Sequence, residues 1–283
     1  MSVSHPQTLR LGLSSCPNDT FIFHALLHGI APAPLPLQPH MADVEELNTL
    51  ARQGKLDVTK ISLGVVPWIM DDYALLSSGA ALGWGCGPLV VARESLPPTA
   101  WRTASLAVPG AMTTANLLLT LHGGFHGPRR AMLFSDVMPA VARGEADLGL
   151  VIHEGRFTYE RLGLVKVLDL GQWWEQEYHL PLPLGAIAVR RDIPLPTALA
   201  LQRAIAASLA CAQADPAASR EFVRAHAQEM EEQVTEAHIK TFVTEFSLDL
   251  GPAGRAAIEN LVGRAAVLQG RRLPVDGLFL SSE

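Results

Sequence analysis

Cysteine is scarce in this sequence, and the cysteines form no recognisable pattern. The 283 residues include three of them, Cys16, Cys86 and Cys211, an odd number with long separations and no C-x-x-C pair. Disulfide frameworks use even numbers of cysteines, and structural zinc sites use closely spaced pairs. We therefore expect three reduced thiols, as in a cytosolic protein, and neither a disulfide framework nor a zinc site.

Clustered positive charge and an export signal are also missing. Lys and Arg number 22 against 28 Asp and Glu, a formal charge of −6, and no Lys/Arg run is present to neutralise phosphates. Residues 1–8 contain no basic segment followed by an apolar one. A long uncharged stretch, residues 73–92, carries four glycines and Pro88, unlike a spanning helix of about 20 residues. We expect a cytoplasmic location, no nucleic-acid partner and no membrane insertion.

The short motifs that mark common cofactor sites and nucleophiles are absent. No G-x-G-x-x-G follows a strand pattern, and neither G-x-x-x-x-G-K nor G-x-S-x-G occurs. These absences argue against dinucleotide, nucleoside-triphosphate and hydrolase-elbow sites. The ten histidines show no H-E-x-x-H or similar spacing. We therefore expect no metal and no cofactor.

What the sequence does contain is a repeated strand–helix rhythm, with 48% hydrophobic residues to form a core. In the first half we expect strands at 9–14 and 56–61, helices at 18–28 and 45–53, and a proline-rich connector from Pro32 to Pro39. A strand at 88–92 and a crossover at 93–99 follow. The second half has strand patterns at 104–108, 131–134 and 146–152, with helices opening near Thr113 and Ser135.

The strand predicted at 185–189 returns to the first half, and residues from 195 onward read as helical. The predicted fold is α/β and two-lobed, with a helical C-terminal segment. Residues 1–90 plus 188–283 would form a larger, discontinuous lobe 1, and residues 91–187 would form lobe 2. A chain of this length exceeds what one core usually serves, so we expect a ligand cleft between the lobes.

Polar residues gather where several of the predicted strands end. These sets are residues 14–20, 60–62 and 113–116, and His153 closes a fourth strand. Open parallel sheets bind ligands beyond the carboxyl ends of their strands. An imidazole in that place can accept a proton, and Glu154 beside it could orient a substrate or the ring. The alternatives are a helix-capping or core histidine and a solvated glutamate.

The other sets indicate an anion site. Free backbone N–H groups at the start of a helix near Thr114 and Ala115 are suited to a carboxylate, although most such turns only cap a helix. Lys60 and Ser62 would add a cation and a hydroxyl, unless Lys60 is an ordinary surface lysine. These residues by themselves indicate a two-lobed binder or enzyme for small anions.

Several ordered segments, taken together, are more specific. They are SCPNDTFIF at 15–23, TKIS at 59–62, GPLVVA at 87–92, VPG at 108–110 with TTA at 113–115, IHE at 152–154 with RFTY at 156–159, and LPLG at 182–185. This combination resembles the 1,4-dihydroxy-6-naphthoate synthases of the futalosine route to menaquinone. The likeness runs in order from about Leu9 to the final helices.

The resemblance implies a type II periplasmic-binding-protein-like fold that has become an enzyme. It implies a cofactor-independent carbon–carbon lyase for a small-molecule carboxylate, which converts cyclic dehypoxanthinyl futalosine to 1,4-dihydroxy-6-naphthoate and a three-carbon fragment. The family's proton acceptor falls on His153. The residues that fall on its substrate-binding stretches are Lys60, Ile61, Ser62, Thr114 and Ala115, and further matching residues, expected to line the site, are Asn18, Asp19 and Glu154.

Two alternatives remain open from the sequence. One is a non-catalytic solute-binding protein for a small carboxylate or sulfonate, because one fold can host many functions. The other is a related chorismate-consuming enzyme of the same pathway, from which we expect a different combination at 16–19 and 152–154. We expect a monomer or weak homodimer.

Overall fold

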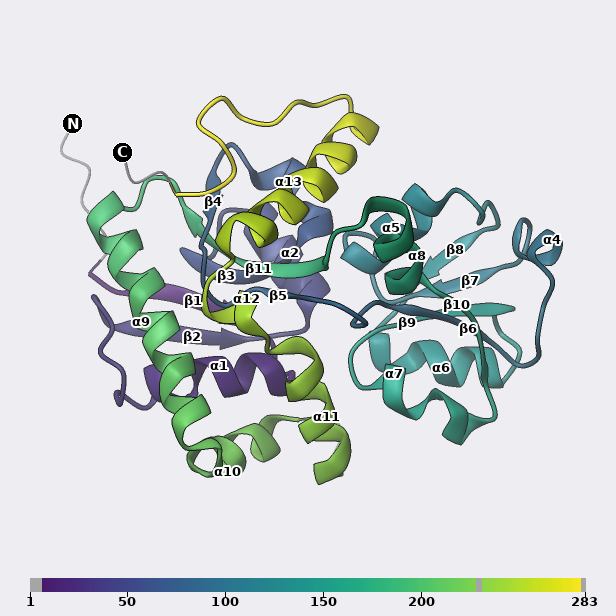
Figure 1. Ribbon diagram of the computed structural model, residues 1–283, viewed down its shortest axis with the longest axis horizontal. Helices are drawn as coiled ribbons and strands as arrows, with labels where there is room; N and C mark the ends of the chain where they lie inside the picture. Colours follow the sequence, from purple (N-terminus) through teal and green to yellow (C-terminus); the bar gives the residue numbers. More distant parts are fainter. Residues whose placement is uncertain (1–6, 228–230, 281–283) are drawn as a thin grey trace.

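The computed structural model describes residues 7–227 and 231–280, and within them the chain forms two β-sheets that lie side by side, each with its own helices (Figure 1). Strand order in the first sheet is β2-β1-β3-β11-β4, with β5 also paired to β11. Its strands are β1 (Leu9–Leu13), β2 (Leu37–Met41), β3 (Val58–Ser62), β4 (Tyr73–Leu75), β5 (Ala81–Gly83) and β11 (Leu182–Arg190). β1 runs parallel to β2 and β3, and β11 runs antiparallel to β3.

The second sheet has the order β10-β6-β9-β7-β8. Its strands are β6 (Leu89–Ala92), β7 (Leu106–Val108), β8 (Arg129–Ala131), β9 (Leu148–Val151) and β10 (Val165–Asp169). β7 pairs in parallel with β8 and β9, whereas β6 is antiparallel to β9 and β10. The helices around it are α4 (Pro98–Trp101), α5 (Thr114–His122), α6 (Phe134–Ala142), α7 (Gly155–Thr158) and α8 (Leu170–Tyr178).

The helices of the first sheet come from both ends of the chain. α1 (Pro17–Leu27) and α2 (Val44–Arg52) belong to the N-terminal half, with η1 (Leu63–Val65) and α3 (Val66–Ile69) after β3. The C-terminal helices are α9 (Leu195–Ala214), α10 (Pro216–His226), α11 (Glu232–Phe242), α12 (Glu245–Leu248) and α13 (Gly251–Leu268). These C-terminal helices pack around the first sheet and not around the second (Figure 1). The predicted helical C-terminal segment is therefore confirmed.

In the described part of the chain, α9 is the one helix whose length and composition would suit a membrane span. It packs against α1, and the Ser208 hydroxyl joins the two helices by donating to Ile22 O at 2.7 Å and accepting from Leu26 N at 2.9 Å. A stripe of α9 that includes Leu201, Ile205 and Leu209 is fully buried. This helix therefore contributes one face to the core of the first sheet.

Two local predictions were wrong. The connector predicted around Pro39 contains β2, in which Pro39 is tolerated because β2 is the edge strand of its sheet. The crossover predicted at residues 93–99 lies elsewhere, because β6 already pairs within the second sheet and the chain therefore crosses at residues 84–88. The lobe division at 90/91 and 187/188 stays a prediction. Cuts at 88/89 and 181/182 would leave β6 and β11 whole.

The two sheets are pressed together beside η1. A Cβ on Gly64 would lie 2.5 Å from Met112 O and 2.7 Å from Thr113 O, so only glycine permits this approach of η1 to the turn before α5. Glu45 of α2 accepts from Met112 N at 2.9 and 3.2 Å. One buried apolar cluster includes Ile61 of β3 and Leu150 of β9. These contacts hold the two halves against each other around a shared boundary.

Candidate active site

A cavity opens at the boundary between the two sheets, with about 700 Å³ of space including its open mouth. The lining residues include Ser14, Asn18, Asp19, Lys60, Ile61, Ser62, Cys86, Gly87, Thr113, Thr114, Ala115, Ile152, His153, Arg156, Leu184, Gly185 and Phe242. The cavity therefore receives the ends of strands from both sheets.

The corner between β1 and α1 delivers the first group of side chains. Cys16 is the extended N-cap of α1, and Pro17 occupies the first helical turn, where its missing N–H costs nothing. Asp19 is fully buried, and one of its oxygens accepts from the backbone N–H of Ser14 at 3.2 Å and from its hydroxyl at 2.7 Å. The strand end and the helix start are thus fixed to each other by one carboxylate.

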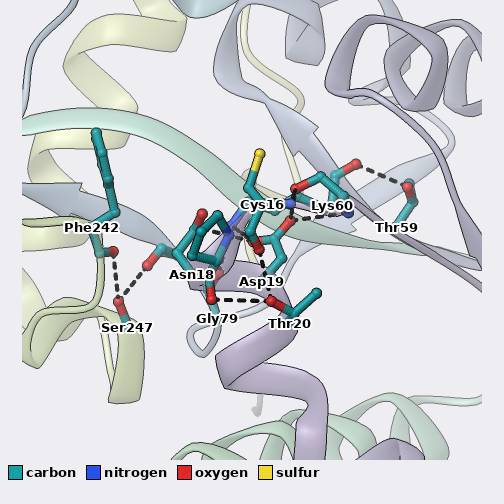
Figure 2. Close-up of polar contacts among 12 residues, drawn as sticks. Cys16, Asn18, Asp19, Thr20, Thr59, Lys60, Gly79, Phe242 and Ser247 are labelled. Atoms are coloured by element: carbon teal, nitrogen blue, oxygen red, sulfur yellow. Dashed lines mark hydrogen bonds and ion pairs between the residues drawn. The ribbon is translucent and has the colours of Figure 1, made fainter. Parts of the chain in front are cut away.

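Lys60 meets that carboxylate from β3 (Figure 2). Its ammonium lies 2.8 Å from Asp19 Oδ1 and donates to Gly79 O at 3.2 Å, with only 5% of the residue exposed. A buried charge of this kind is stable only when paired and hydrogen-bonded. β3 lies inside the sheet, so the alternative of a surface lysine on an edge strand is wrong. Lys60 is held in place at the cavity wall.

His153 follows β9 and faces the α1 corner across the boundary. Its Nδ1 lies 3.4 Å from Cys16 Sγ, and its ring lies 5.0 Å from that of Phe134. Its φ of 53° is left-handed, which is uncommon for a histidine and is often found at functional sites. Burial lowers the pKa of His153, against the opposing effects of Glu154 and Asp19. The imidazole is therefore held mainly uncharged.

Cys16 is a neutral neighbour for that imidazole. Burial raises the pKa of the Cys16 thiol well above its ordinary value, and the charges of Glu154 and Asp19 raise it further. A reactive cysteine needs a thiolate, which these surroundings disfavour. We therefore interpret Cys16 as a packing and hydrogen-bonding partner of His153. The sequence placed Cys16 in the 14–20 set but did not predict this contact.

The start of α5 supplies the opposite wall. α5 begins at Thr114, close to the start that the sequence predicted, and Thr113 caps it by accepting from Asn116 N at 3.2 Å. The Thr114 hydroxyl donates to Leu184 O at 2.5 Å and accepts from Gly64 N at 3.2 Å. Because the fold uses this hydroxyl, any ligand there would be held through backbone N–H groups of Thr114 and Ala115.

A second cation, Arg156 of α7, lines the cavity without having been given a role by the sequence. Its guanidinium donates to Gly87 O and pairs with Asp169 at 3.0 Å. Gly87 itself lies against Gly171, because a Cβ on Gly87 would be 2.2 Å from Gly171 N. Arg156 therefore fixes the crossing segment at residues 84–88 to the second sheet.

The structure brings most of the predicted site residues into one cavity. Asn18, Asp19, Lys60, Ile61, Ser62, Thr114, Ala115 and His153 all line it. Glu154 does not line it: its side chain is buried, and its Oε2 has no hydrogen-bond partner among the described residues. No group of three or more potential metal ligands occurs in residues 7–227 and 231–280. The roles of these residues stay predictions.

Comparisons with known proteins agree on one family. The family model described as "Menaquinone biosynthesis" matches residues 9–267. Two relatives named 1,4-dihydroxy-6-naphtoate synthase, from Thermus thermophilus and Streptomyces coelicolor, are each 48% identical to this chain. Each alignment covers 92% of this chain and 94% or 93% of the relative. The match therefore spans both sheets and the C-terminal helices.

Solved structures support the fold. A protein from Archaeoglobus fulgidus has a TM-score of 0.87 and 32% identity, with 94% of this chain and 99% of that chain covered. The alkanesulfonate-binding protein SsuA from Xanthomonas axonopodis pv. citri has a TM-score of 0.71 and 13% identity, covering 98% and 97%. The likeness to SsuA shows that this chain has a periplasmic-binding-protein-like fold, and it does not indicate which ligand this chain binds. On the family match and the two close relatives, the chain belongs to the menaquinone biosynthesis family.

Proposed function

We propose that this protein is a 1,4-dihydroxy-6-naphthoate synthase, a cytoplasmic lyase that cleaves cyclic dehypoxanthinyl futalosine into 1,4-dihydroxy-6-naphthoate and a three-carbon fragment. The observation that carries the proposal is that a chain 48% identical to two proteins of that name gathers His153, Lys60 and Thr114 in one cavity. We further propose that no cofactor takes part and that the protein is a monomer or weak homodimer.

The proposed chemistry begins with an anion held between the lobes. The amides of Thr114 and Ala115 bind the substrate's acid group, and Lys60 and Ser62 contact its polar groups from the other wall. Lys60 keeps Asp19 as its partner, so its charge is partly neutralised. The substrate's carboxylate is therefore bound mainly by backbone N–H donors at the start of α5.

His153 is the proposed general base. The nearer ring atom to Cys16 Sγ is Nδ1, at 3.4 Å against 3.9 Å for Nε2, and the proposed reaction needs the tautomer in which Nδ1 carries the hydrogen and the lone pair on Nε2 is free. Nε2 would remove a substrate proton and start a retro-aldol-like C–C cleavage that ends in an aromatic ring. The pKa of His153, lowered by burial, keeps the base form available at neutral pH.

Conversion of cyclic dehypoxanthinyl futalosine by the purified protein, followed by chromatography and mass spectrometry, tests the function. We expect kcat of His153→Ala to fall by about 10² to 10⁴ with substrate binding retained. His153→Asn is the matched variant, because asparagine tolerates the left-handed backbone that alanine resists. Near-wild-type turnover in both variants would remove His153 from the reaction.

The two alternatives predict no conversion of cyclic dehypoxanthinyl futalosine, and further measurements tell them apart. A solute-binding protein would bind a small carboxylate or sulfonate in calorimetry and yield no product. A chorismate-consuming enzyme would deplete chorismate instead. The synthase is favoured because the relatives that carry that name are 48% identical, whereas the sulfonate-binding neighbour is 13% identical.

A further inference from the structure

A second histidine reaches the candidate site from the C-terminal helices. His238 lies in α11, is completely buried, and places its Nε2 2.9 Å from Asn18 Oδ1. The two residues are 220 positions apart in the chain. Nothing in the spacing of the histidines distinguishes His238 from the others, so the sequence assigned it no role.

The surrounding hydrogen bonds fix the direction of this contact. Asn18 donates from Nδ2 to Asp19 Oδ1 at 2.9 Å, which turns its amide oxygen toward His238. An amide oxygen can only accept, so Nε2 of His238 carries the hydrogen. The other ring nitrogen, Nδ1, is buried without a hydrogen-bond partner in the described part of the chain.

The contact continues to the ion pair at the cavity wall. His238 donates to Asn18, Asn18 donates to Asp19, and the same Asp19 oxygen receives the Lys60 ammonium at 2.8 Å. All four side chains are at least nine-tenths buried. In this dry setting each hydrogen bond restricts the next, so the orientation of Asp19 depends on His238.

The C-terminal helices also support Lys60, the other residue of the ion pair, through Ser247 and Gly79. Gly79 N donates to Ser247 O at 2.7 Å, and Gly79 O accepts from Lys60 at 3.2 Å (Figure 2). Ser247 is fully buried in α12 and also donates to Ala80 O at 2.7 Å. The helices α11 and α12 thus support Asp19 and Lys60 from outside the cavity.

His238 also faces the proposed base directly. Its ring is 6.0 Å from that of His153 and inclined to it by only 11°. Burial, followed by the neighbouring His153 and Lys60, holds the pKa of His238 well below its ordinary value.

We propose that His238 is a positioning residue of the active site, which donates a hydrogen bond from Nε2 to Asn18 and so orients Asp19 and Lys60 beside His153. This inference rests on the proposed function of the cavity. The competing explanation is that the ring of His238 only fills space, since it also packs 4.6 Å from the ring of Phe242.

Two polar substitutions separate these explanations. In His238→Gln the amide nitrogen can replace Nε2 and reach Asn18, whereas the shorter side chain of His238→Asn cannot. We expect His238→Asn to lower kcat about tenfold to a hundredfold with a smaller change in KM, because small misplacements of reacting groups are costly. His238→Gln should recover most of that loss.

His238→Phe tests packing, because it keeps an aromatic ring and loses the donor. We expect it to lose kcat as His238→Asn does while melting close to the wild type. His226→Gln is the control, since His226 bonds to Phe222 O in α10 and does not line the cavity. Wild-type kcat in His238→Phe, or equal losses in the Gln and Asn variants, would overturn the proposal.

Nitrogen NMR of the histidine rings at neutral pH gives a readout that does not need turnover. We expect His238 as the Nε2–H tautomer, and this signal should be perturbed by Asn18→Ala. An Nδ1–H tautomer would overturn the positioning role even in an active enzyme. A wild-type protein that leaves cyclic dehypoxanthinyl futalosine unchanged but shows the Nε2–H tautomer would contradict the proposed function instead.

Discussion

Two nearly parallel imidazoles, His153 and His238, meet where the two sheets face each other. Burial lowers the pKa of both rings below the ordinary value of 6.5. Between the folded and ordinary pKa values the unfolded chain binds more protons than the folded one. The folded protein is therefore stabilised above about pH 6.5 and loses that contribution as the pH falls toward the folded pKa values.

This linkage predicts a pH-dependent free energy of unfolding. We expect it to decrease between about pH 7 and pH 5, with a shallower decrease in His238→Gln, which removes one depressed imidazole. Urea unfolding across this range measures both slopes. His24 and His122, whose pKa values burial also lowers, contribute equally to both proteins and cancel in the comparison. Identical slopes would show that His238 titrates normally.

A second residue-scale prediction concerns the rate. If His153 must be uncharged to act, kcat/KM should rise with pH and reach its plateau with an apparent pKa below 6.5, because burial lowers the pKa of His153. The pH profile of initial rates checks this. A plateau reached only at a pKa above 6.5 would point to a different base.

Among the elements, the approach of η1 to the turn before α5 depends on one glycine. We expect Gly64→Ala to destabilise the protein by roughly 1–3 kcal/mol, because its Cβ would press on two backbone carbonyls that cannot rotate away. Its kcat should fall as well, since Ser62 and Thr114 flank this contact.

Gly263→Ala is the matched control, because a Cβ there lies 4.0 Å from its nearest neighbour in the middle of α13. It should leave stability unchanged or raise it by up to about 1 kcal/mol through helix propensity. Urea denaturation compares the two variants. Equal stability would mean that η1 and the turn can shift apart at little cost.

Elements with strong local signals could be predicted from the sequence. The helix at Thr114–His122 follows a Thr113 cap, and the strand at Leu148–Val151 is a buried apolar run. β2 was missed because Pro39 and the prolines just before the strand favour a loop, and only its place at the sheet edge makes a strand possible. The crossing at 84–88 was misplaced because a buried run such as β6 does not reveal which sheet it joins.

Some residues of the candidate site could likewise be predicted from the sequence, and others could not. Lys60 lies in β3, and Thr114 and His153 come after β7 and β9, so their meeting at the carboxyl ends of strands could be predicted from α/β topology. His238 could not, because its contact with Asn18 joins residues 220 positions apart through helix packing alone. The sequence places His238 one turn before Phe242 on a helix, which is the pattern of an ordinary core position. The structure confirms that the residue is fully buried.

At the scale of the whole molecule, Glu45 joins the two halves next to Val44, a residue that lines the cavity. It accepts from Met112 N with both oxygens, and a Cβ on Gly110 would lie 2.6 Å from its carboxyl carbon. The Thr114 hydroxyl and the Arg161–Glu231 ion pair also cross this boundary. We expect the Glu45 carboxylate to be one of the contacts on which closure of the cavity depends.

We expect Glu45→Ala to raise KM about fivefold, which corresponds to the loss of ~1 kcal/mol of hydrogen bonding. Small-angle scattering of the unliganded variant should give a larger radius of gyration than the wild type. Glu46→Ala, next in the same helix and exposed, is the control. An unchanged KM and radius in Glu45→Ala would show that the other contacts between the halves hold them together without this carboxylate.

The thiol of Cys16 is buried where the two halves meet, whereas Cys211 is exposed on α9. After Cys86→Ala and Cys211→Ser, Cys16 is the one thiol left for a reagent to modify, and we expect the reagent to reach it when the halves separate. The rate of that labelling then reports how often the two halves separate, without any added dye or spin label. If substrate draws the halves together, the labelling of Cys16 should slow in proportion to the fraction of time that the cavity is closed.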